Sequence, residues 1–234
     1  MDLSSKKVLI IGMAMSGIGS ANLCLRHGAK VTVSDSKPEE QLKENLSHLL
    51  PGYQVNKILG RAPLAEEASD ADLIILSPAV PADLPFLDEA RTKGVTIWSE
   101  IELAYRLCQA PIIGITGTNG KTTTTTLVGE VLKAWKSGSV AAGNIGLAFT
   151  SVAEELKADA RVALELSSFQ LETIDSLKPV VSAILNFTPD HLNRHHTYEN
   201  YVAAKCRVYE NQTSEDVCVL NYDDELVREK GIEL

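Results

Sequence analysis

One segment identifies the architecture of this chain more directly than any other: Gly114-Ile115-Thr116-Gly117-Thr118-Asn119-Gly120-Lys121-Thr122-Thr123. It follows the apolar run 112–116, which is typical of a strand, and it precedes residues 121–136, whose pattern is typical of a helix. Glycine-rich turns between a strand and a helix bind phosphate through backbone N–H groups and the positive end of the helix dipole. The segment therefore predicts a nucleotide-binding loop in an α/β fold.

The loop is a variant of the usual motif G-x4-G-K-[ST], because Ile115 occupies the position of the first glycine and Gly117 lies closer to Gly120. Lys121 is expected to reach the β- and γ-phosphates, and Thr122 to bind Mg²⁺. The alternative is a glycine turn capped by threonines. However, the β-branched residues 122–126 are poor helix formers, which indicates that something other than helix propensity selected at least the first of them. The predicted ATP-binding residues are Gly117, Thr118, Asn119, Gly120, Lys121, Thr122 and Thr123.

Short apolar runs alternate with longer amphipathic runs along the whole chain, which predicts βα units and parallel sheets. Strands are expected at 7–11, 30–34, 71–77, 95–98, 112–116, 140–142, 161–166, 180–186 and 216–221. Helices are expected at 18–27, 39–50, 84–93, 99–107, 121–136, 198–211 and 223–234. The fold class is therefore α/β, with two tandem Rossmann-like parallel-sheet domains, the second of them a P-loop ATPase-type domain.

The domain boundary is expected near residue 99, which gives a first domain of residues 1–98 and a second of 99–234. The second series of strands and helices stops early. We therefore expect this P-loop domain to be truncated, and its closing strands and any third domain to be absent.

The composition restricts the class of protein. Hydrophobic residues make up 44% and charged residues 23%, which are values of a globular chain. The net charge of −9, without a basic run, argues against a nucleic-acid partner. Four scattered cysteines predict reduced thiols rather than disulfides or a zinc site. The apolar run 8–11 is too short for an export signal or a membrane span, so a cytoplasmic protein without a membrane partner is expected. We also expect a monomer.

Two candidate metal ligands follow predicted strands, at the edge where α/β sheets bind ligands. Glu165 could hold Mg²⁺ opposite Thr122, or it could be an edge residue that faces solvent. His191 follows a turn forced by Pro189 and could lie beside the same crevice, although a single histidine is more often structural. Asp190 could orient His191 or be a simple turn residue.

Lys205 stands out because it shares a helical stripe with Tyr201 and Val208. An ammonium group on an apolar face is unfavourable unless it is paired, chemically altered or extended to solvent. Burial lowers the pKa of a lysine, and the neutral amine can add CO₂ to form a carbamate that binds a metal. Extension of the side chain to solvent is the simpler alternative.

The first domain carries a second glycine-rich turn, Gly12-Met13-Ala14-Met15-Ser16-Gly17, and Asp35 ends the next strand. This pattern is similar to a dinucleotide-binding fingerprint, but Ala14 stands in place of its second glycine, which argues against NAD. The pocket is free to accept the phosphate or base of another nucleotide. Residues 77–80, at the end of another strand, could line it. Ordinary turn chemistry explains the same residues without a ligand.

Taken together, these residues resemble the Mur ligase family over essentially the whole chain. The order of the two domains and the sequence G-T-N-G-K-T-T carry the resemblance, together with Gly143-Asn144-Ile145-Gly146, 186–195 and Tyr201-Val202-Ala203-Ala204-Lys205. The segment Glu165-Leu166-Ser167-Ser168-Phe169-Gln170-Leu171-Glu172 looks like that of the family's D-glutamate-adding member.

The resemblance implies a two-step reaction with ATP, UDP-N-acetylmuramoyl-L-alanine and D-glutamate, through an acyl phosphate. It implies two Mg²⁺ ions, one held by Thr122 and Glu165, the other by His191 and a carbamate on Lys205. The implied catalytic residues are Lys121, His191 and Lys205. The implied substrate-binding residues are Ser16, Asp35, Ser36, Ser77, Val80, Asn144, Ser167, Gln170 and Arg194. The family's C-terminal domain, which helps to bind ATP and D-glutamate, is missing, so we expect the chain alone to have little activity.

Two further departures from the family pattern are Asn193, where aspartate is usual, and Ala79, where glycine is common. Asn193 puts a contact of the metal ligands in doubt, and Ala79 could alter the UDP pocket. Three alternatives stay open: a family member that adds another amino acid, an NAD-dependent oxidoreductase, and a nucleotide-binding module without catalysis. The segment 167–172 argues against the first, and the P-loop against the second.

Overall fold

A computed structural model describes residues 1–232 of the chain. The chain forms two compact units, Met1–Leu107 and Cys108–Leu234. The division lies nine residues after the predicted boundary, because helix α5 (Glu100–Tyr105) belongs with the first unit. Leu103 is buried in the first unit's core, and Trp98 and Leu107 pack against that core.

The first unit contains a five-stranded parallel sheet in the order β3-β2-β1-β4-β5. Its strands are β1 (Lys7–Ile11), β2 (Lys30–Asp35), β3 (Asn56–Leu59), β4 (Leu73–Leu76) and β5 (Thr96–Ser99). Its other helices are α1 (Met15–Arg26), α2 (Glu39–Leu46), α3 (Ala65–Ser69) and α4 (Pro85–Thr92). The order changes direction between β1 and β4, and such switch points form ligand crevices at the carboxyl ends of strands.

The strands of this unit are continuous apolar runs because both faces of the sheet are covered. Val8 and Ile10 of β1 are buried in one cluster, whereas Leu9 and Ile11 are buried in another. A parallel sheet that is buried on both faces requires such continuous apolar sequence. The edge strand β3 and the short α3 were not predicted, because the sequence of β3, NKIL, is half polar and only partly buried.

The second unit has a parallel sheet in the order β10-β9-β6-β8-β7. Its strands are β6 (Ile112–Thr116), β7 (Val140–Gly143), β8 (Val162–Glu165), β9 (Val181–Ile184) and β10 (Val217–Leu220). Its helices are α6 (Lys121–Trp135), α7 (Ser168–Leu171), α8 (Leu192–His195), α9 (Tyr198–Cys206) and α10 (Glu225–Ile232), with 3-10 turns η1 (Phe149–Ser151), η2 (Ala153–Glu155) and η3 (Arg207–Tyr209). The short helices α7 and α8 were not predicted, and the last two residues of the helix predicted at 223–234 lie outside the described part of the chain.

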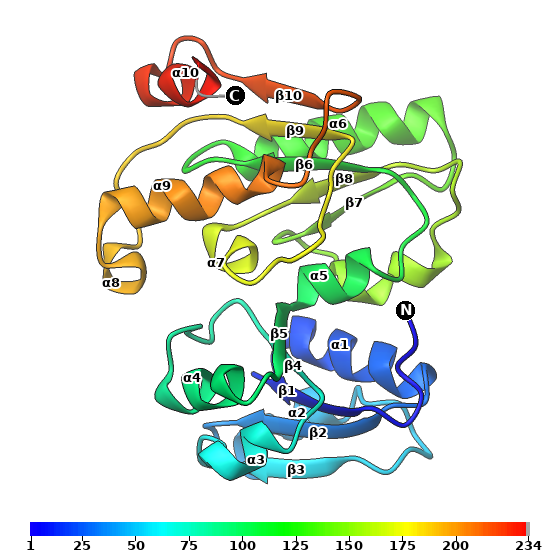
Figure 1. Ribbon diagram of the computed structural model, residues 1–234. Coiled ribbons are helices and arrows are strands. Elements are labelled where there is room, and N and C mark those ends of the chain that lie inside the picture. Colours follow the sequence, from blue (N-terminus) through cyan, green and yellow to red (C-terminus); the bar gives the residue numbers. More distant parts are fainter. Residues whose placement is uncertain (233–234) are drawn as a thin grey trace. The chain divides into compact units, whose positions relative to one another are not determined.

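The strand order and register bring the predicted site segments of this unit to one edge. In the sheet Ile115 of β6 pairs with Glu165 of β8, and Thr116 pairs with Ile184 of β9. The segments that follow β6, β8 and β9 therefore leave the sheet side by side. Helix α6 packs on β6, β7 and β8, whereas α7 packs against α9, and Figure 1 shows these two groups on opposite faces of the sheet. The α/β fold class with parallel sheets is confirmed.

Candidate functional site

The glycine-rich loop 117–123, called here the phosphate loop, joins β6 to α6 as predicted. Gly117 and Gly120 have φ angles of 146° and 81°, which side-chain-bearing residues rarely adopt. Gly120 is the N-cap of α6, and no side chain caps this helix terminus. Because the first turn of a helix leaves its N–H groups without intrahelical partners, α6 presents donors and a positive dipole end to a ligand.

Two lysine ammonium groups bind carbonyl oxygens of this loop. Lys121 Nζ donates to Thr118 O at 2.8 Å, and Lys205 Nζ donates to Gly117 O at 2.8 Å. A peptide loop that holds two cations and the terminus of a helix dipole attracts anions. The structure thus places two of the predicted catalytic residues, Lys121 and Lys205, at the same loop.

The side chain of Lys205 points inward rather than to solvent. Only 2% of the residue is exposed, and its ammonium lies 4.8 Å from the ring centre of Tyr201, which is 1% exposed. Burial, and next the positive charge of Lys121, lower the pKa of Lys205 to about 7, against the opposing effect of Asp190 and Glu165. Close to neutral pH, a large share of this lysine is therefore the neutral amine, which is the form that reacts with CO₂.

Glu165 is buried at the end of β8 with an unsatisfied oxygen. Its Oε1 accepts a hydrogen bond from Asn144 Nδ2 at 3.1 Å, while Oε2 is buried and has no partner. Gly143 allows this arrangement, because a Cβ there would collide with the carbonyl oxygen of Glu165. A buried carboxylate oxygen without a partner is unfavourable unless a ligand satisfies it. Glu165 is thus buried, not a solvent-facing edge residue.

His191 adopts a left-handed conformation with φ 51° and lies on the ring of Phe169, with 4.8 Å between ring centres. Its side chain is about half exposed, and Nε2 is 3.5 Å from Asp190 Oδ2. Asp190 Oδ1 also accepts from the His191 N–H at 2.8 Å. The ring contact agrees with the predicted option that Asp190 orients His191, and the main-chain contact agrees with the other option, that Asp190 is a turn residue.

Arg194 and the unpredicted residues His195 and Glu172 form a nearly buried network under His191. Arg194 donates to both carboxylate oxygens of Glu172, at 3.3 and 2.6 Å, and its guanidinium lies 4.9 Å from the Phe169 ring centre. His195 Nε2 is 2.9 Å from Ser168 Oγ. Burial, followed by the charge of Arg194, lowers the pKa of His195 to about 4, so this imidazole is neutral at pH 7.

Ser167 and Gln170 act locally as a capping box for α7. Ser167 Oγ accepts from the Gln170 N–H at 3.3 Å, and Gln170 Oε1 accepts from the Ser167 N–H at 2.9 Å. Gln170 is buried, so its side chain orients the turn after β8. The same segment that resembles a family motif thus has a structural role of its own.

In the first unit, a cavity of about 370 Å³ lies at the carboxyl ends of β1, β2 and β4. Four of the five UDP-site residues predicted there line it: Asp35, Ser36, Ser77 and Val80. Asp35 Oδ2 accepts from the Met13 N–H at 2.7 Å, and Ser77 Oγ donates to Gly12 O at 2.7 Å. Ser16 is not among the lining residues. It lies in the first turn of α1, where its carbonyl accepts from Ser20 Oγ.

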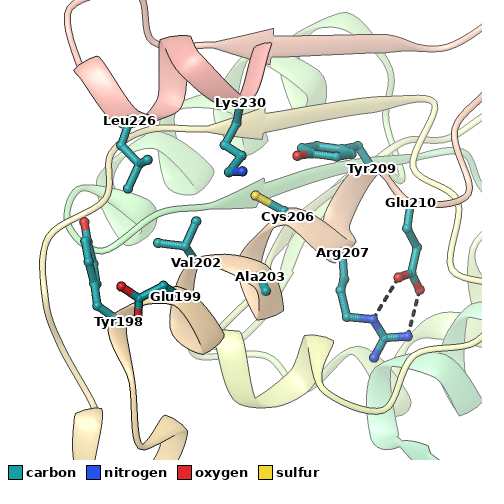
Figure 2. A pocket seen from close by; sticks show the side chains of 10 residues that line it. All are labelled: Tyr198, Glu199, Val202, Ala203, Cys206, Arg207, Tyr209, Glu210, Leu226 and Lys230. Carbon is teal, nitrogen blue, oxygen red and sulfur yellow. Dashed lines mark hydrogen bonds and ion pairs between the residues drawn. The ribbon is translucent and has the colours of Figure 1, made fainter. Parts of the chain in front are cut away.

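A separate groove of about 630 Å³ lies between α9 and α10, and the sequence did not predict it. Figure 2 shows Leu226 and Lys230 of α10 facing Val202 and Cys206 of α9 across it. Helix α9 therefore borders two different surroundings. Tyr201 and Lys205 face the phosphate loop, and the next stripe faces this apolar groove.

The donor groups of the second unit fit one Mg²⁺ ion. Within residues 1–232, no three His, Cys, Asp or Glu side chains gather closely enough to hold a metal ion by themselves. Protein-bound Mg²⁺ commonly has one or two carboxylates, with phosphate oxygens and water as its other ligands. The orphaned Oε2 of Glu165 fits one ion of this kind. Nothing comparable marks a second ion at His191.

No helix in the described chain is long and apolar enough to cross a membrane.

Comparisons with known proteins extend over both units. Residues 6–99 match the N-terminal domain of MurD-like Mur ligases, and residues 115–233 match the Mur ligase middle domain. The chain is 51% identical over 232 residues to a UDP-N-acetylmuramoylalanine–D-glutamate ligase from Alkaliphilus oremlandii, covering 99% of this chain and 51% of the relative. It is 48% identical to the protein of the same name from Clostridioides difficile, covering 97% of this chain and 50% of the relative. The chain thus spans about half the length of these curated relatives.

Solved structures agree on the fold. The UDP-N-acetylmuramate:L-alanyl-γ-D-glutamyl-meso-diaminopimelate ligase of Neisseria matches 99% of this chain and 76% of its own, with a TM-score of 0.62 at 17% identity. The UDP-N-acetylmuramate–alanine ligase of Thermotoga maritima matches 94% of this chain and 50% of its own, with a TM-score of 0.50 at 25% identity. With two matched domains in the predicted order, this chain belongs to the Mur ligase family.

Proposed function

We propose that this chain carries the nucleotide site and the UDP-substrate site of an ATP-dependent amide ligase that adds D-glutamate to UDP-N-acetylmuramoyl-L-alanine. One observation carries the proposal: Lys121 and the buried Lys205 bind the same loop, and β8 beside that loop ends in the buried carboxylate of Glu165. The substrates are supplied by the names of the two relatives that are 51% and 48% identical to this chain over the aligned residues.

In the proposed reaction, the γ-phosphoryl group of ATP passes to the carboxylate of the muramoyl-alanine substrate, giving an acyl phosphate and ADP. The amine of D-glutamate then attacks the acyl carbon, and phosphate leaves. Lys121 exchanges its bond to Thr118 O for the β- and γ-phosphate oxygens, and the N–H groups of the first turn of α6 bind the same phosphates. These groups catalyse by positioning the reactants and by neutralising charge.

The other proposed roles follow the same edge of the sheet. Thr122 and Glu165 would hold one Mg²⁺, and His191 and a carbamate on Lys205 a second. Bound Mg²⁺ supplies positive charge to the phosphate oxygens. Asn144 orients Glu165 through its hydrogen bond to Oε1, and Ser167, Gln170 and Arg194 contact the muramoyl substrate or the phosphates. The lowered pKa of Lys205 supports the carbamate, because it provides the neutral amine.

The cavity of the first unit is the proposed site of the UDP group. Asp35 holds the turn after β1 through the Met13 N–H, and Ser36, Ser77 and Val80 line the same cavity. We retain Ser16 only as a residue of the adjoining helix α1, since it does not line the cavity. The protein is proposed to act as a monomer in the cytoplasm, without nucleic-acid or membrane partners.

Isothermal titration tests the proposal on this chain. Mg-ATP is expected to bind, and Lys121→Ala to weaken that binding. UDP-N-acetylmuramoyl-L-alanine is expected to bind more tightly than UDP-N-acetylmuramic acid, which lacks the alanine, and Asp35→Ala to weaken its binding. Preference for the compound without alanine would indicate an alanine-adding member of the family instead. A folded chain that binds neither ligand would contradict the proposal.

A further inference from the structure

Asn186, which follows β9, pairs with the phosphate loop as a neighbouring strand would. Asn119 N donates to Asn186 Oδ1 at 2.8 Å, and Asn186 Nδ2 donates back to Asn119 O at 3.0 Å. The main-chain carbonyl of Asn186 accepts from Thr118 N at 3.0 Å. One asparagine therefore satisfies one polar group in each of three consecutive peptide groups of the loop.

These bonds determine where the opposite ends of the peptide groups point. In a planar trans peptide the N–H and C=O bonds point in opposite directions. The Thr118 N–H points to Asn186, so the Gly117 carbonyl of the same peptide points away from it, to Lys205 Nζ. The Asn119 N–H points to Asn186 as well, so the Thr118 carbonyl points away, to Lys121 Nζ.

The third peptide group follows the same rule. Because the Asn119 carbonyl accepts from Asn186 Nδ2, the Gly120 N–H of that peptide points away from Asn186. The N–H groups of Thr118 and Asn119 are already hydrogen-bonded to Asn186, so they are not donors for phosphate. The donors for phosphate are therefore the N–H group of Gly120 and those of the first turn of α6.

The loop also approaches the Asn186 segment too closely for a side chain. A Cβ on Gly117 would lie 3.0 Å from Leu185 Cβ and 3.3 Å from Asn186 N. Thr118 adds a second connection, because its Oγ1 accepts from Thr188 N at 3.0 Å and is 2.8 Å from the Tyr201 hydroxyl.

We propose that Asn186 is a positioning residue of the phosphate loop: it orients three consecutive peptide groups so that Lys121 and the Gly120 N–H face one phosphate position, while the Gly117 carbonyl holds Lys205 Nζ beside it. This inference rests on the proposed function for the identity of the ligand. The bonds between Asn186 and the loop are independent of any ligand, so they can be tested separately.

The test compares Asn186→Ala with Asn221→Ala in this chain. Asn221 is a matched control, because its Nδ2 donates to Leu185 O at 2.9 Å from the end of the neighbouring strand β10. Thermal unfolding first checks that both variants are folded. Amide hydrogen exchange of the ligand-free chain, followed by NMR, then reports on the loop, and titration with Mg-ATP reports on the site.

Asn186→Ala is expected to raise the exchange rate of the Asn119 amide about tenfold and to lower the affinity for Mg-ATP about tenfold. The exchange rates of the β6 amides are expected to stay unchanged. Asn186→Asp keeps the Oδ1 acceptor and loses the Nδ2 donor, so it is expected to preserve the Asn119 protection and still weaken Mg-ATP. Asn221→Ala is expected to change neither quantity.

Unchanged exchange at Asn119 together with unchanged Mg-ATP affinity in Asn186→Ala would overturn the proposal. Equal effects of Asn186→Ala and Asn221→Ala would also overturn it, because they would indicate a general weakening of this edge. If the unsubstituted chain does not bind Mg-ATP, the proposed function fails instead, and the exchange rates alone decide whether Asn186 holds the loop.

Discussion

The two units share a glycine turn after their first strand, but side chains of different charge surround the two turns. In each, the first strand ends in a glycine turn with positive φ, at Gly12 (93°) and Gly117 (146°), and a helix follows. In each, a strand that neighbours this first strand ends in a carboxylate, Asp35 on β2 and Glu165 on β8. The turns differ in what surrounds them.

In the first unit the carboxylate satisfies the turn itself. Asp35 accepts from the N–H groups of Met13 and Lys37, so both of its oxygens are used. In the second unit Asn186 satisfies the turn, and this leaves one oxygen of Glu165 without a partner and two lysines on the loop carbonyls. In the proposed function, a neutral amide in place of an acidic group leaves the second turn free to accept phosphate and metal. Two turns of similar backbone geometry thus differ in the side chains that surround them.

The order of strands is the second difference. In the first sheet the next strand in the chain, β2, lies beside β1, whereas in the second sheet β7 goes to the edge and β8 lies beside β6. A carboxylate next to the turn consequently comes from the second strand in one unit and from the third in the other. This explains why Asp35 lies close in sequence to its turn and Glu165 lies far from its own.

The largest expected effect is that of the cation on the second turn. Lys121→Ala is predicted to lower the affinity for Mg-ATP about 100-fold, because it removes charge-assisted hydrogen bonds to phosphate. Binding of UDP-N-acetylmuramoyl-L-alanine by the first unit is predicted to be unchanged. Lys133→Ala, on the exposed face of the same helix, is the control in calorimetric titrations. An equal loss in both variants would show that net charge, rather than the site, attracts the nucleotide.

The next effect concerns the carboxylate of the first turn. Asp35→Ala is predicted to lower the affinity for UDP-N-acetylmuramoyl-L-alanine about tenfold, because the Met13 and Lys37 N–H groups lose their acceptor and the turn reorganises. Mg-ATP affinity is predicted to stay the same. Asp88→Ala, at an exposed ion pair of this unit, is the control. Loss of Mg-ATP instead of the UDP compound would reverse the assignment of the two turns.

A smaller effect is expected from the carboxylate of the second turn. Glu165→Gln keeps an acceptor for Asn144 but removes the negative charge, so the increase in ATP affinity that Mg²⁺ produces is predicted to fall about fivefold. Affinity for ATP in the presence of a chelator is predicted to be unchanged. If Mg²⁺ strengthens ATP binding as much in the variant as in the unsubstituted chain, Glu165 is not a metal ligand.

The smallest effect is one of stability and pH. The pKa of His195 is lowered to about 4, so between about pH 6.5 and 4 the unfolded chain binds a proton that the folded chain does not. The stability that the neutral imidazole contributes is complete above pH 6.5 and is lost as the pH falls. His195→Gln is predicted to reduce the loss of unfolding free energy between pH 7 and 5 by about 1 kcal/mol in urea denaturation. His48→Gln, at an exposed position, is predicted to show no such change.

Sequence patterns predicted the parts of this molecule that are encoded locally. The glycine turn at 117–120 and the stripe of Tyr201 and Lys205 depend on spacing within one segment, so their positions were predictable. The unit to which α5 belongs was not, because α5 joins the first unit through long-range packing of Leu103. The same holds for Ser16, since the direction of the first turn of α1 depends on the turn before it.

The network around the site was invisible in the sequence for a related reason. Asn186 reaches Asn119 across 67 positions, and Glu172 reaches Arg194 across 22. Neither asparagine nor glutamate carries a local signal for such a contact, and both residues lie in segments that the family resemblance had already assigned to other roles. The pairing of β6 with β9, and the packing of both α7 and α8 against α9, bring these partners together.

The most direct test of the difference between the two turns is an NMR titration of the ¹⁵N-labelled chain with Mg-ATP. The amide resonances of Gly117 and Gly120 are predicted to shift to saturation, while those of Gly12 and Gly17 stay in place until UDP-N-acetylmuramoyl-L-alanine is added. Shifts at Gly12 and Gly17 on addition of Mg-ATP, with Gly117 and Gly120 unmoved, would contradict the account.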